Sequence, residues 1–149
     1  IDKILHFHPF SLFIAALLIA CSVSFKLWFS GEAGFPWYFI YLTVVALLPS
    51  LGFYHCAKHF INWRAFSFTA LIIVLISLLW EVTLALPYQW WGFQHSAMMG
   101  IYIQAWHGLP IEEIVLWFAV SYTSVILYEV IKIWLASNKT IKQAFLGHH

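Results

Sequence analysis

The segment AFSFTALIIVLISLLWEVTLAL, residues Ala65–Leu86, decides the fold class because it is apolar throughout except for one charged residue, Glu81. A helix needs about 20 apolar residues to cross a hydrocarbon core of roughly 30 Å, and this segment is long enough. Of all residues in the chain, 63% are hydrophobic, 20% aromatic and only 9% charged. Too few polar side chains remain to cover a water-soluble surface. The sequence therefore predicts an integral membrane protein.

Three other apolar runs of comparable length accompany this segment. The four predicted spans lie at about Pro9–Phe29, Pro36–Cys56, Ala65–Leu86 and Pro110–Leu135. The runs are continuous rather than alternating in polarity, which is typical of membrane helices and not of barrel strands. Pro49 and Gly52 should kink or loosen the second helix. We expect an all-α polytopic membrane protein, a bundle of about four transmembrane helices, forming a single domain over residues 1–149.

The basic residues are unequally divided between the two sides of such a bundle. With four spans, both termini lie on the same side as the loop between the second and third spans. That side collects Lys3, Lys58, Arg64, Lys132, Lys139 and Lys142. The opposite side has only Lys26, and its long loop Pro87–Leu109 has no Lys or Arg. The positive-inside rule predicts cytoplasmic termini, and we expect the inner membrane of a bacterium.

Ionisable side chains within the apolar runs are costly unless they are paired or solvated, so they are candidate functional residues. Glu81 lies near the outer end of the third span, and Glu112 and Glu113 open the fourth span on the same side. Three carboxyl groups are thus expected at one depth, beside a loop that has no basic residue to neutralise them. We expect Glu81 to be neutral, hydrogen-bonded or facing a cavity.

Each of these acids also has a structural interpretation. Acidic residues after Pro110 are favoured in the first turn of a helix by its dipole, and Glu81 could form an interhelical hydrogen bond. Because adjacent helical positions point about 100° apart, we expect one of Glu112 and Glu113 to face the bundle and the other to face the interface. Glu129 is expected to pair with Lys132, three residues on, and lies too far along the helix to join the other acids.

Aromatic residues are concentrated around the predicted acid cluster. They are Trp80, Tyr88, Trp90, Trp91, Phe93, Tyr102, Trp106 and Trp117. An interfacial aromatic belt accounts for many of them. A carboxylic acid kept protonated by apolar surroundings and facing aromatic rings is also suited to protonating an alkene and stabilising the resulting carbocation. These aromatic residues are therefore candidate substrate-binding residues.

The stretches WEVTLALPYQWWGF (Trp80–Phe93), GLPIEEIVLWF (Gly108–Phe118) and YTSVILYEV (Tyr122–Val130) resemble the membrane lycopene β-cyclase domain of the bacterial, archaeal and fungal type. That family has a Trp-Asp pair at a helix end, a loop with Trp and Gly, and a Pro-x-Glu-Glu motif opening the next helix. The resemblance covers about residues 36–135 and leaves an extra N-terminal helix at about 9–29. Glu81 stands where the family has Asp, and Leu116-Trp117 replaces an aromatic pair.

The resemblance implies that the linear ends of lycopene or a related carotenoid are cyclised into β-ionone rings. This is an isomerisation in which an acid protonates the terminal alkene, the ring closes on the cation and a base removes a proton. Carried onto this chain, the resemblance makes Glu112 or Glu113 the acid and Glu81 its partner, base or orienting group. It implies no cofactor. Because members often work as pairs of half-sized chains, it implies a homodimer or a heterodimer with another cyclase-like subunit.

Two alternatives remain open. The first is a non-catalytic subunit that binds a carotenoid or another lipid, or that packs into a larger membrane complex. The second is a metal or haem site at His55 and His59, near His6 and His8, although a single H-x-x-x-H pair makes interfacial histidines the simpler interpretation. His95 and His107, in the long loop, could instead assist proton transfer near the acids. A net charge of +1 argues against nucleic acid as a partner.

Overall fold

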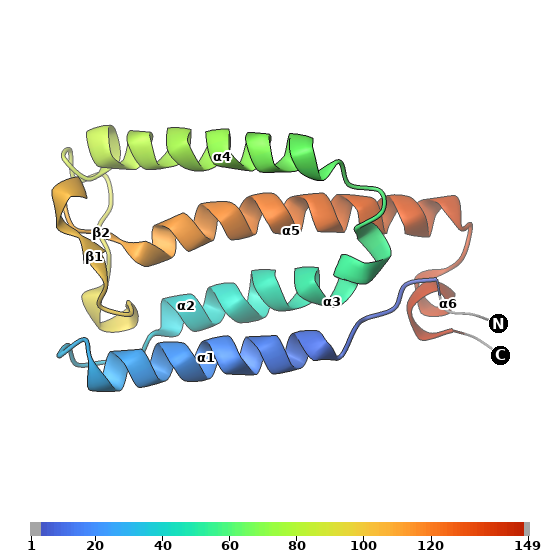
Figure 1. The fold of residues 1–149 in the computed structure, drawn as a ribbon, viewed down its shortest axis with the longest axis horizontal. Coiled ribbons are helices and arrows are strands. Elements are labelled where there is room, and N and C mark those ends of the chain that lie inside the picture. Colours follow the sequence, from blue (N-terminus) through green and yellow to red (C-terminus); the bar gives the residue numbers. More distant parts are fainter. Residues whose placement is uncertain (1–3, 148–149) are drawn as a thin grey trace.

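Four long helices lie side by side in the computed structural model, which describes residues 4–147 (Figure 1). The segments that are long and apolar enough to cross a membrane are Phe10–Trp28, Trp37–Ala57, Trp63–Ala85 and Ile111–Ala136. The predicted all-α, four-helix membrane fold is confirmed, with each predicted span matched to within a few residues. Lys3, counted above among the basic residues, lies outside the described residues.

The elements follow one another as up-and-down helices with one elaborate loop. The helices are α1 (Phe10–Trp28), α2 (Trp37–Leu42), α3 (Leu48–Ala57), α4 (Trp63–Trp80), α5 (Ile111–Ala136) and the short α6 (Ile141–Leu146). The loop before α5 contains single helical turns at His95–Ala97 and Gln104–Trp106, and an antiparallel pair of two-residue strands, β1 (Tyr102–Ile103) and β2 (Leu109–Pro110). The sequence did not predict this strand pair or α6.

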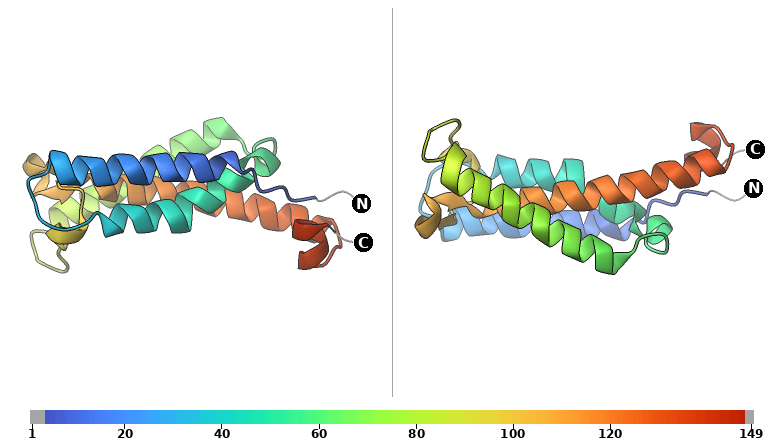
Figure 2. Two further views of the ribbon diagram at one scale, coloured as in Figure 1. Left: turned by 90° about the horizontal axis from the view of Figure 1, so that it is seen from below. Right: turned by 90° about the horizontal axis from the view of Figure 1, so that it is seen from above.

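Both chain ends lie at one end of the bundle, which we call the terminal end, and β1 and β2 lie at the opposite loop end (Figure 1). Helix α5 is central and packs against α3 and α4, while α1 packs against α3. Helix α4 has its main interhelical contacts with α5 and crosses it at an angle on the outside of the bundle (Figure 2). One flank of α4 is therefore left open.

The second span is interrupted as the sequence predicted near Pro49. Between α2 and α3 the chain forms a π-helical turn at Thr43–Leu47. Proline has no backbone N–H, so the helix loses a hydrogen bond there. Hydroxyl groups add hydrogen bonds beside the interruption: Ser50 Oγ donates to the carbonyl of Ala46 at 2.7 Å, and Thr123 Oγ1 of α5 donates to the same oxygen at 3.1 Å. Such side-chain donors are the usual means of tolerating proline inside a membrane helix.

Gly52 serves a packing role and is not the cause of the interruption. A Cβ atom at this position would overlap the ring of Phe7, which lies in the segment before α1. The backbone N–H of His8 donates to the carbonyl of Gly52 at 2.8 Å. The N-terminal segment is thereby held directly against α3.

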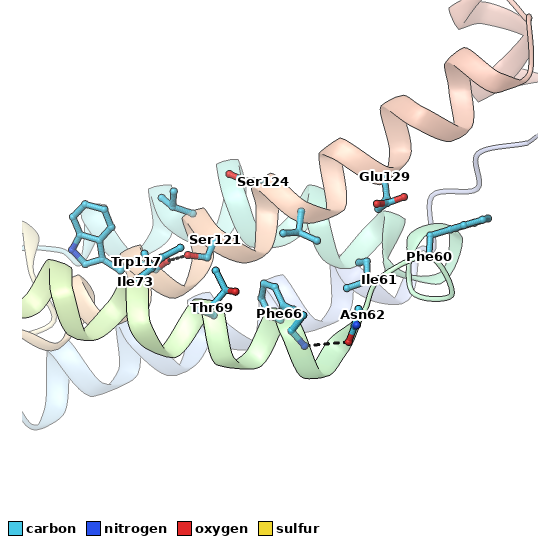
Figure 3. Close-up of a pocket in the computed structure, with 14 residues that line it drawn as sticks. Phe60, Ile61, Asn62, Phe66, Thr69, Ile73, Trp117, Ser121, Ser124 and Glu129 are labelled. Carbon is cyan, nitrogen blue, oxygen red and sulfur yellow. Dashed lines mark hydrogen bonds between the residues drawn. The ribbon is translucent and has the colours of Figure 1, made fainter.

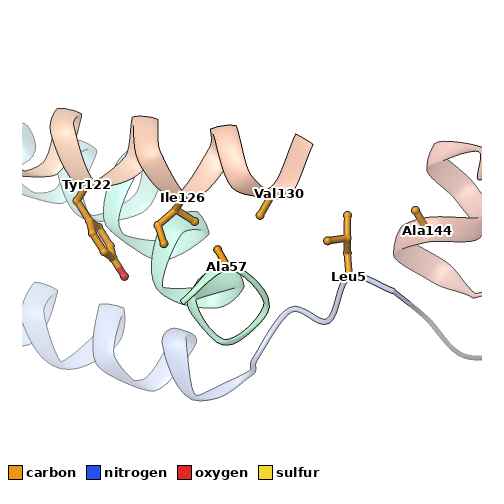
Figure 4. Packing of buried hydrophobic residues seen from close by; sticks show 6 residues of the cluster. All are labelled: Leu5, Ala57, Tyr122, Ile126, Val130 and Ala144. Carbon is orange, nitrogen blue, oxygen red and sulfur yellow. The ribbon is translucent and has the colours of Figure 1, made fainter. Parts of the chain in front are cut away.

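A hydrophobic cluster closes the terminal end (Figure 4). It consists of Leu5, Ala57, Tyr122, Ile126, Val130 and Ala144. Leu5 and Ala144 come from opposite ends of the chain, and the backbone N–H of Leu5 donates to the carbonyl of Ala144 at 3.2 Å. The small residue Ala57 is fully buried, which lets the end of α3 approach α5 closely. The terminal end is thus packed mainly by apolar side chains.

Candidate functional site

Glu81 and Glu113 lie close together at the loop end, although they are 32 positions apart in the sequence. Both are buried, with 1% and 4% of their surface exposed. Glu81 is the first residue of a π-helical turn, Glu81–Ala85, which continues α4. Glu113 lies in the first turn of α5. Their carboxyl groups are close enough to interact electrostatically, so we call them the acid pair.

One oxygen of each carboxyl group in the acid pair is held by a side-chain donor. The indole Nε1 of Trp117 donates to Glu81 Oε1 at 2.9 Å. The hydroxyl of Tyr38, on α2, donates to Glu113 Oε1 at 3.0 Å. Glu81 Oε2 is buried and has no hydrogen-bond partner among the described residues. The sequence prediction that Glu81 is hydrogen-bonded or faces a cavity is confirmed on both counts, whereas the role of Tyr38 was not predicted.

The acid pair lines a cavity of about 370 Å³, which we call the acid cavity. Its other lining residues are Tyr38, Trp91, Gly92, Phe93, Gln94, Met98, Leu116 and Trp117. Four aromatic rings thus share a small volume with two carboxyl groups. The acid cavity combines a proton donor or acceptor with faces that can stabilise a positive charge.

Glu112 does not line the acid cavity. The prediction that one of Glu112 and Glu113 faces the membrane interface is wrong, because both are buried. Glu112 is fully buried, and the backbone N–H of Met99 donates to its Oε1 atom. The loop before α5 folds over the start of the helix and covers this side chain. The prediction placed Glu112 or Glu113 at the interface because the sequence gives no sign that the loop packs back on α5.

Lys26 of α1 is a basic residue that lies near the acids, although the loop beside them has none, as the sequence shows. Its side chain is fully buried, and Nζ lies 3.4 Å from Glu32 Oε2 and 3.2 Å from the carbonyl oxygen of His95. Lys26 is also close enough to interact electrostatically with Glu112. The cation comes from α1 rather than from the loop itself, so inspection of the loop sequence could not reveal it.

Glu32 is the partner of Lys26 in this ion pair, and the sequence did not predict its role. The hydroxyl of Tyr102 donates to Glu32 Oε2 at 3.2 Å. Burial raises the pKa of Tyr102 to about 12, with the nearby charge of Glu32 and the hydrogen bond to it as further causes. Tyr102 therefore remains a hydrogen-bond donor at physiological pH. Lys26, Glu32 and Tyr102 link α1, the loop that follows it and β1.

A second cavity, of about 350 Å³, lies beside the acid cavity, and we call it the vestibule. Its lining residues are Glu32, Leu86, Gly92, Phe93, His95, Tyr102, Gln104, His107 and Gly108. Gly92 and Phe93 line both cavities. The vestibule is polar where the acid cavity is aromatic, and it contains both histidines that the sequence suggested for proton transfer.

A groove of about 440 Å³ lies between α4 and α5 (Figure 3). It runs along the helices from Trp117 to Glu129 and Phe60, and its walls include Phe66, Ile73 and Val120. Trp117 lines both the groove and the acid cavity. Glu129, at the far end of the groove, pairs with Lys132 at 3.0 Å as predicted. The apolar groove therefore ends at Trp117, whose indole N–H donates to Glu81.

The predicted aromatic residues do not form one site. Of those candidates, only Trp91, Phe93 and Trp117 line the acid cavity. Trp80 packs against Trp90 and Trp91, with ring centroids 6.0 and 4.8 Å apart, and Tyr88 lies beside Trp90 at 6.4 Å. Trp106 lines a separate small cavity beside α4, and Tyr102 faces the vestibule. The sequence predicted that these aromatic residues lie at a similar depth in the membrane, but it did not predict which of them line the same cavity.

The histidines near the terminal end are stacked rather than arranged around a centre. The rings of His8 and His55 lie 4.5 Å apart and nearly parallel. Among residues 4–147, no three His, Cys, Asp or Glu side chains are placed to hold a metal ion.

No known protein family, curated protein or solved structure matches this chain.

Proposed function

We propose that this protein is a carotenoid cyclase of the lycopene β-cyclase type, which isomerises the linear end of a polyene into a ring within the membrane. One observation carries the proposal. The acid pair lies in an aromatic cavity at the end of an apolar groove, and Trp117 contacts both spaces. The Pro-x-Glu-Glu resemblance at Pro110–Glu113 supports the same assignment.

The acid pair is suited to carry one proton. Two carboxylate charges this close in an apolar cavity repel each other strongly, and one proton on either carboxyl group removes that repulsion. Glu81 Oε1 accepts from Trp117, so a proton on that group would bind Oε2, which has no partner among residues 4–147. The hydroxyl of Tyr38 donates to Glu113 Oε1 and stabilises the carboxylate form of Glu113.

The chemical balance requires nothing beyond the acid pair. The acid forms a C–H bond at the terminal double bond, and the carbocation that results is attacked by a second double bond to close the ring. A neighbouring C–H bond then loses its proton to the carboxylate, and a new ring double bond forms. One proton is donated and one is taken back, so the substrate and product are isomers. The rings of Trp91, Phe93 and Trp117 are placed to stabilise the cation.

Pigment analysis tests this proposal. The chain is expressed in cells that accumulate lycopene, alone and together with a half-sized cyclase subunit, and the pigments are analysed for β-rings. We expect Glu81→Gln and Glu113→Gln to abolish ring formation, because each removes a carboxyl group from the acid pair. Glu112→Gln, which changes a buried acid that lines neither the groove nor the acid cavity, is the matched control and should retain it. Absence of cyclised product under both conditions, with the protein inserted in the membrane, would refute the proposal.

A non-catalytic carotenoid- or lipid-binding subunit is the second candidate. The groove favours it, because an apolar space between α4 and α5 can hold a long chain whether or not the acid pair reacts. This candidate predicts that lycopene co-purifies unchanged with the protein and that Glu113→Gln leaves the amount of bound pigment unaltered. Pigment extracted from the purified protein distinguishes the two candidates directly.

We further propose cytoplasmic termini and assembly as a homodimer or with another cyclase-like subunit, or within a larger membrane complex. The terminal end carries Lys58, Arg64 and Lys132, whereas Lys26 at the loop end is buried in an ion pair. Burial of Lys26 sharpens the charge difference on which the positive-inside rule depends. Reaction of Cys56 or of a cysteine introduced at Ala105 with an impermeant reagent, in oriented vesicles, determines which end is cytoplasmic.

A further inference from the structure

We infer that the vestibule is the path by which water and protons reach the acid pair from the aqueous loop end, while the groove admits the polyene from the bilayer. The inference rests on the proposed function for the use that is made of the proton, but the path itself stands on the cavities. The acid pair would thus receive water and protons from one side and the polyene from the other.

The two cavities adjoin each other through Gly92 and Phe93, which line both. On one side of this boundary are the buried carboxyl groups of Glu81 and Glu113. On the other are the polar side chains of the vestibule, which include a carboxylate, a phenol, an amide and two imidazoles. A polar cavity of this size holds water readily, because one water molecule needs only about 10–15 Å³. Gly92 and Phe93 therefore mark the place where the vestibule meets the acid cavity.

Glu81 Oε2 is the observation that points to water in the acid cavity. This atom is buried and has no partner among the described residues, although nearly all buried polar atoms in proteins are hydrogen-bonded. Glu81 itself is 1% exposed and lines the acid cavity. A water molecule in that cavity would satisfy Oε2 and would connect it to the vestibule. Trp117 covers the opposite side of the pair, where the apolar groove begins.

The vestibule contains groups that can pass protons in sequence. The ring of His95 lies 4.9 Å from the ring of Tyr102, whose hydroxyl donates to Glu32. Lys26 fixes Glu32 from the opposite side, and it also binds the carbonyl of His95. These contacts tie the loops that line the vestibule to α1. His107 lies in the same lining and is exposed.

Gly92 provides a means of closing the path without distorting the fold. A Cβ atom added at this position would meet no atom within 4 Å, and the backbone there does not require glycine. Gly92→Leu therefore places a side chain at the boundary of the two cavities at little cost to folding. Ala105→Leu, on the exposed part of the same loop, is the matched control because Ala105 lines neither cavity.

The test is hydrogen–deuterium exchange of the acid pair, followed by infrared spectroscopy. The full chain in phosphatidylcholine vesicles is transferred to D2O, and the carbonyl stretch of protonated carboxyl groups is recorded with time. Loss of the band in Glu81→Gln with Glu113→Gln assigns it to the pair. We expect Gly92→Leu to slow the exchange about tenfold or more, since only rare opening of the loop would then admit water. Ala105→Leu should exchange at the native rate.

A groove variant separates this result from the fate of the proposed function. Ser124→Leu narrows the groove and should leave the exchange rate unchanged while reducing pigment binding. Exchange in Gly92→Leu at the native rate, equal slowing by Ala105→Leu, or a native protein without a protonated pair would each overturn the inference. Missing cyclisation combined with exchange controlled by Gly92 would instead refute the cyclase and leave the path intact.

Discussion

Replacing Lys26 by Met should destabilise the loop end more than any other single change to a basic residue. The side chain of Lys26 is fully buried, whereas that of its partner Glu32 is 37% exposed. Met occupies a similar volume but cannot donate to Glu32 or to the carbonyl of His95. Glu112, which is buried nearby, would also lose its nearest cation.

The expected loss follows from the burial of the two partners. Removing one member of a buried ion pair costs about 3–5 kcal/mol, mainly because the other charge is left without compensation. Glu32 is partly exposed and can recover some hydration, which lowers this cost. The orphaned carbonyl of His95 adds about 1 kcal/mol or more. We therefore expect Lys26→Met to reduce the free energy of unfolding by about 3 kcal/mol.

Equilibrium unfolding by SDS titration in mixed micelles, followed by tryptophan fluorescence, measures this loss. Lys58→Met is the control, because Lys58 Nζ lies 6.0 Å from the ring of Tyr54 and should contribute only about 0.5 kcal/mol. The double variant Lys26→Met with Glu32→Gln should recover about 1 kcal/mol or more, since neither charge is then left alone. The reasoning fails if Lys26→Met costs no more than Lys58→Met, or if Glu32→Gln gives no recovery.

Two further predictions concern the packing of the second span and the ionisation of Tyr102 in β1. Gly52→Ala should reduce the free energy of unfolding by about 1 kcal/mol or more and displace Phe7 from α3. Unfolding measures the first effect, and faster proteolysis of the N-terminal segment reports the second. Gly92→Ala is the control and should have neither effect, because its added methyl group would meet no atom within 4 Å. The ultraviolet titration of Tyr102, obtained by subtracting Tyr102→Phe, should have its midpoint near pH 12. The raised pKa means that the folded protein favours the neutral phenol of Tyr102. The resulting stabilisation is present below about pH 10 and is lost as the pH rises through 12. Glu32→Gln should lower that midpoint, and an unchanged midpoint would contradict the assigned contact.

The sequence predicted the parts of the structure that depend on local composition. Four apolar runs gave four spans because a membrane helix must satisfy its backbone hydrogen bonds internally. Pro49 predicted the interruption of the second span, and the spacing of Glu129 and Lys132 predicted their ion pair. The common depth of Glu81 and Glu113 was also deducible, since both lie close to the loop end of long helices.

The remaining contacts join positions that no local pattern connects. Tyr38 reaches Glu113 across 75 positions, and Tyr102 reaches Glu32 across 70. Lys26 looked like an isolated basic residue because its partners lie in two separate loops. The π-helical turn at Glu81 contains no proline, and nothing in its residues distinguishes it from ordinary helix. These features arise from packing between helices, which a single sequence does not encode in any readable spacing.

The open groove between α4 and α5 has a consequence for measuring any ligand of this protein. Ile73 and Val120 line it and are 38% and 46% exposed on the lateral face of the bundle, where the acyl chains of a bilayer would lie. A ligand that arrives by this side diffuses in two dimensions and never dissolves in water. Its effective concentration is its mole fraction among the surrounding lipids or detergent molecules. Apparent affinities should therefore weaken in proportion as micelles are added at constant ligand, and should coincide once they are expressed as surface mole fractions.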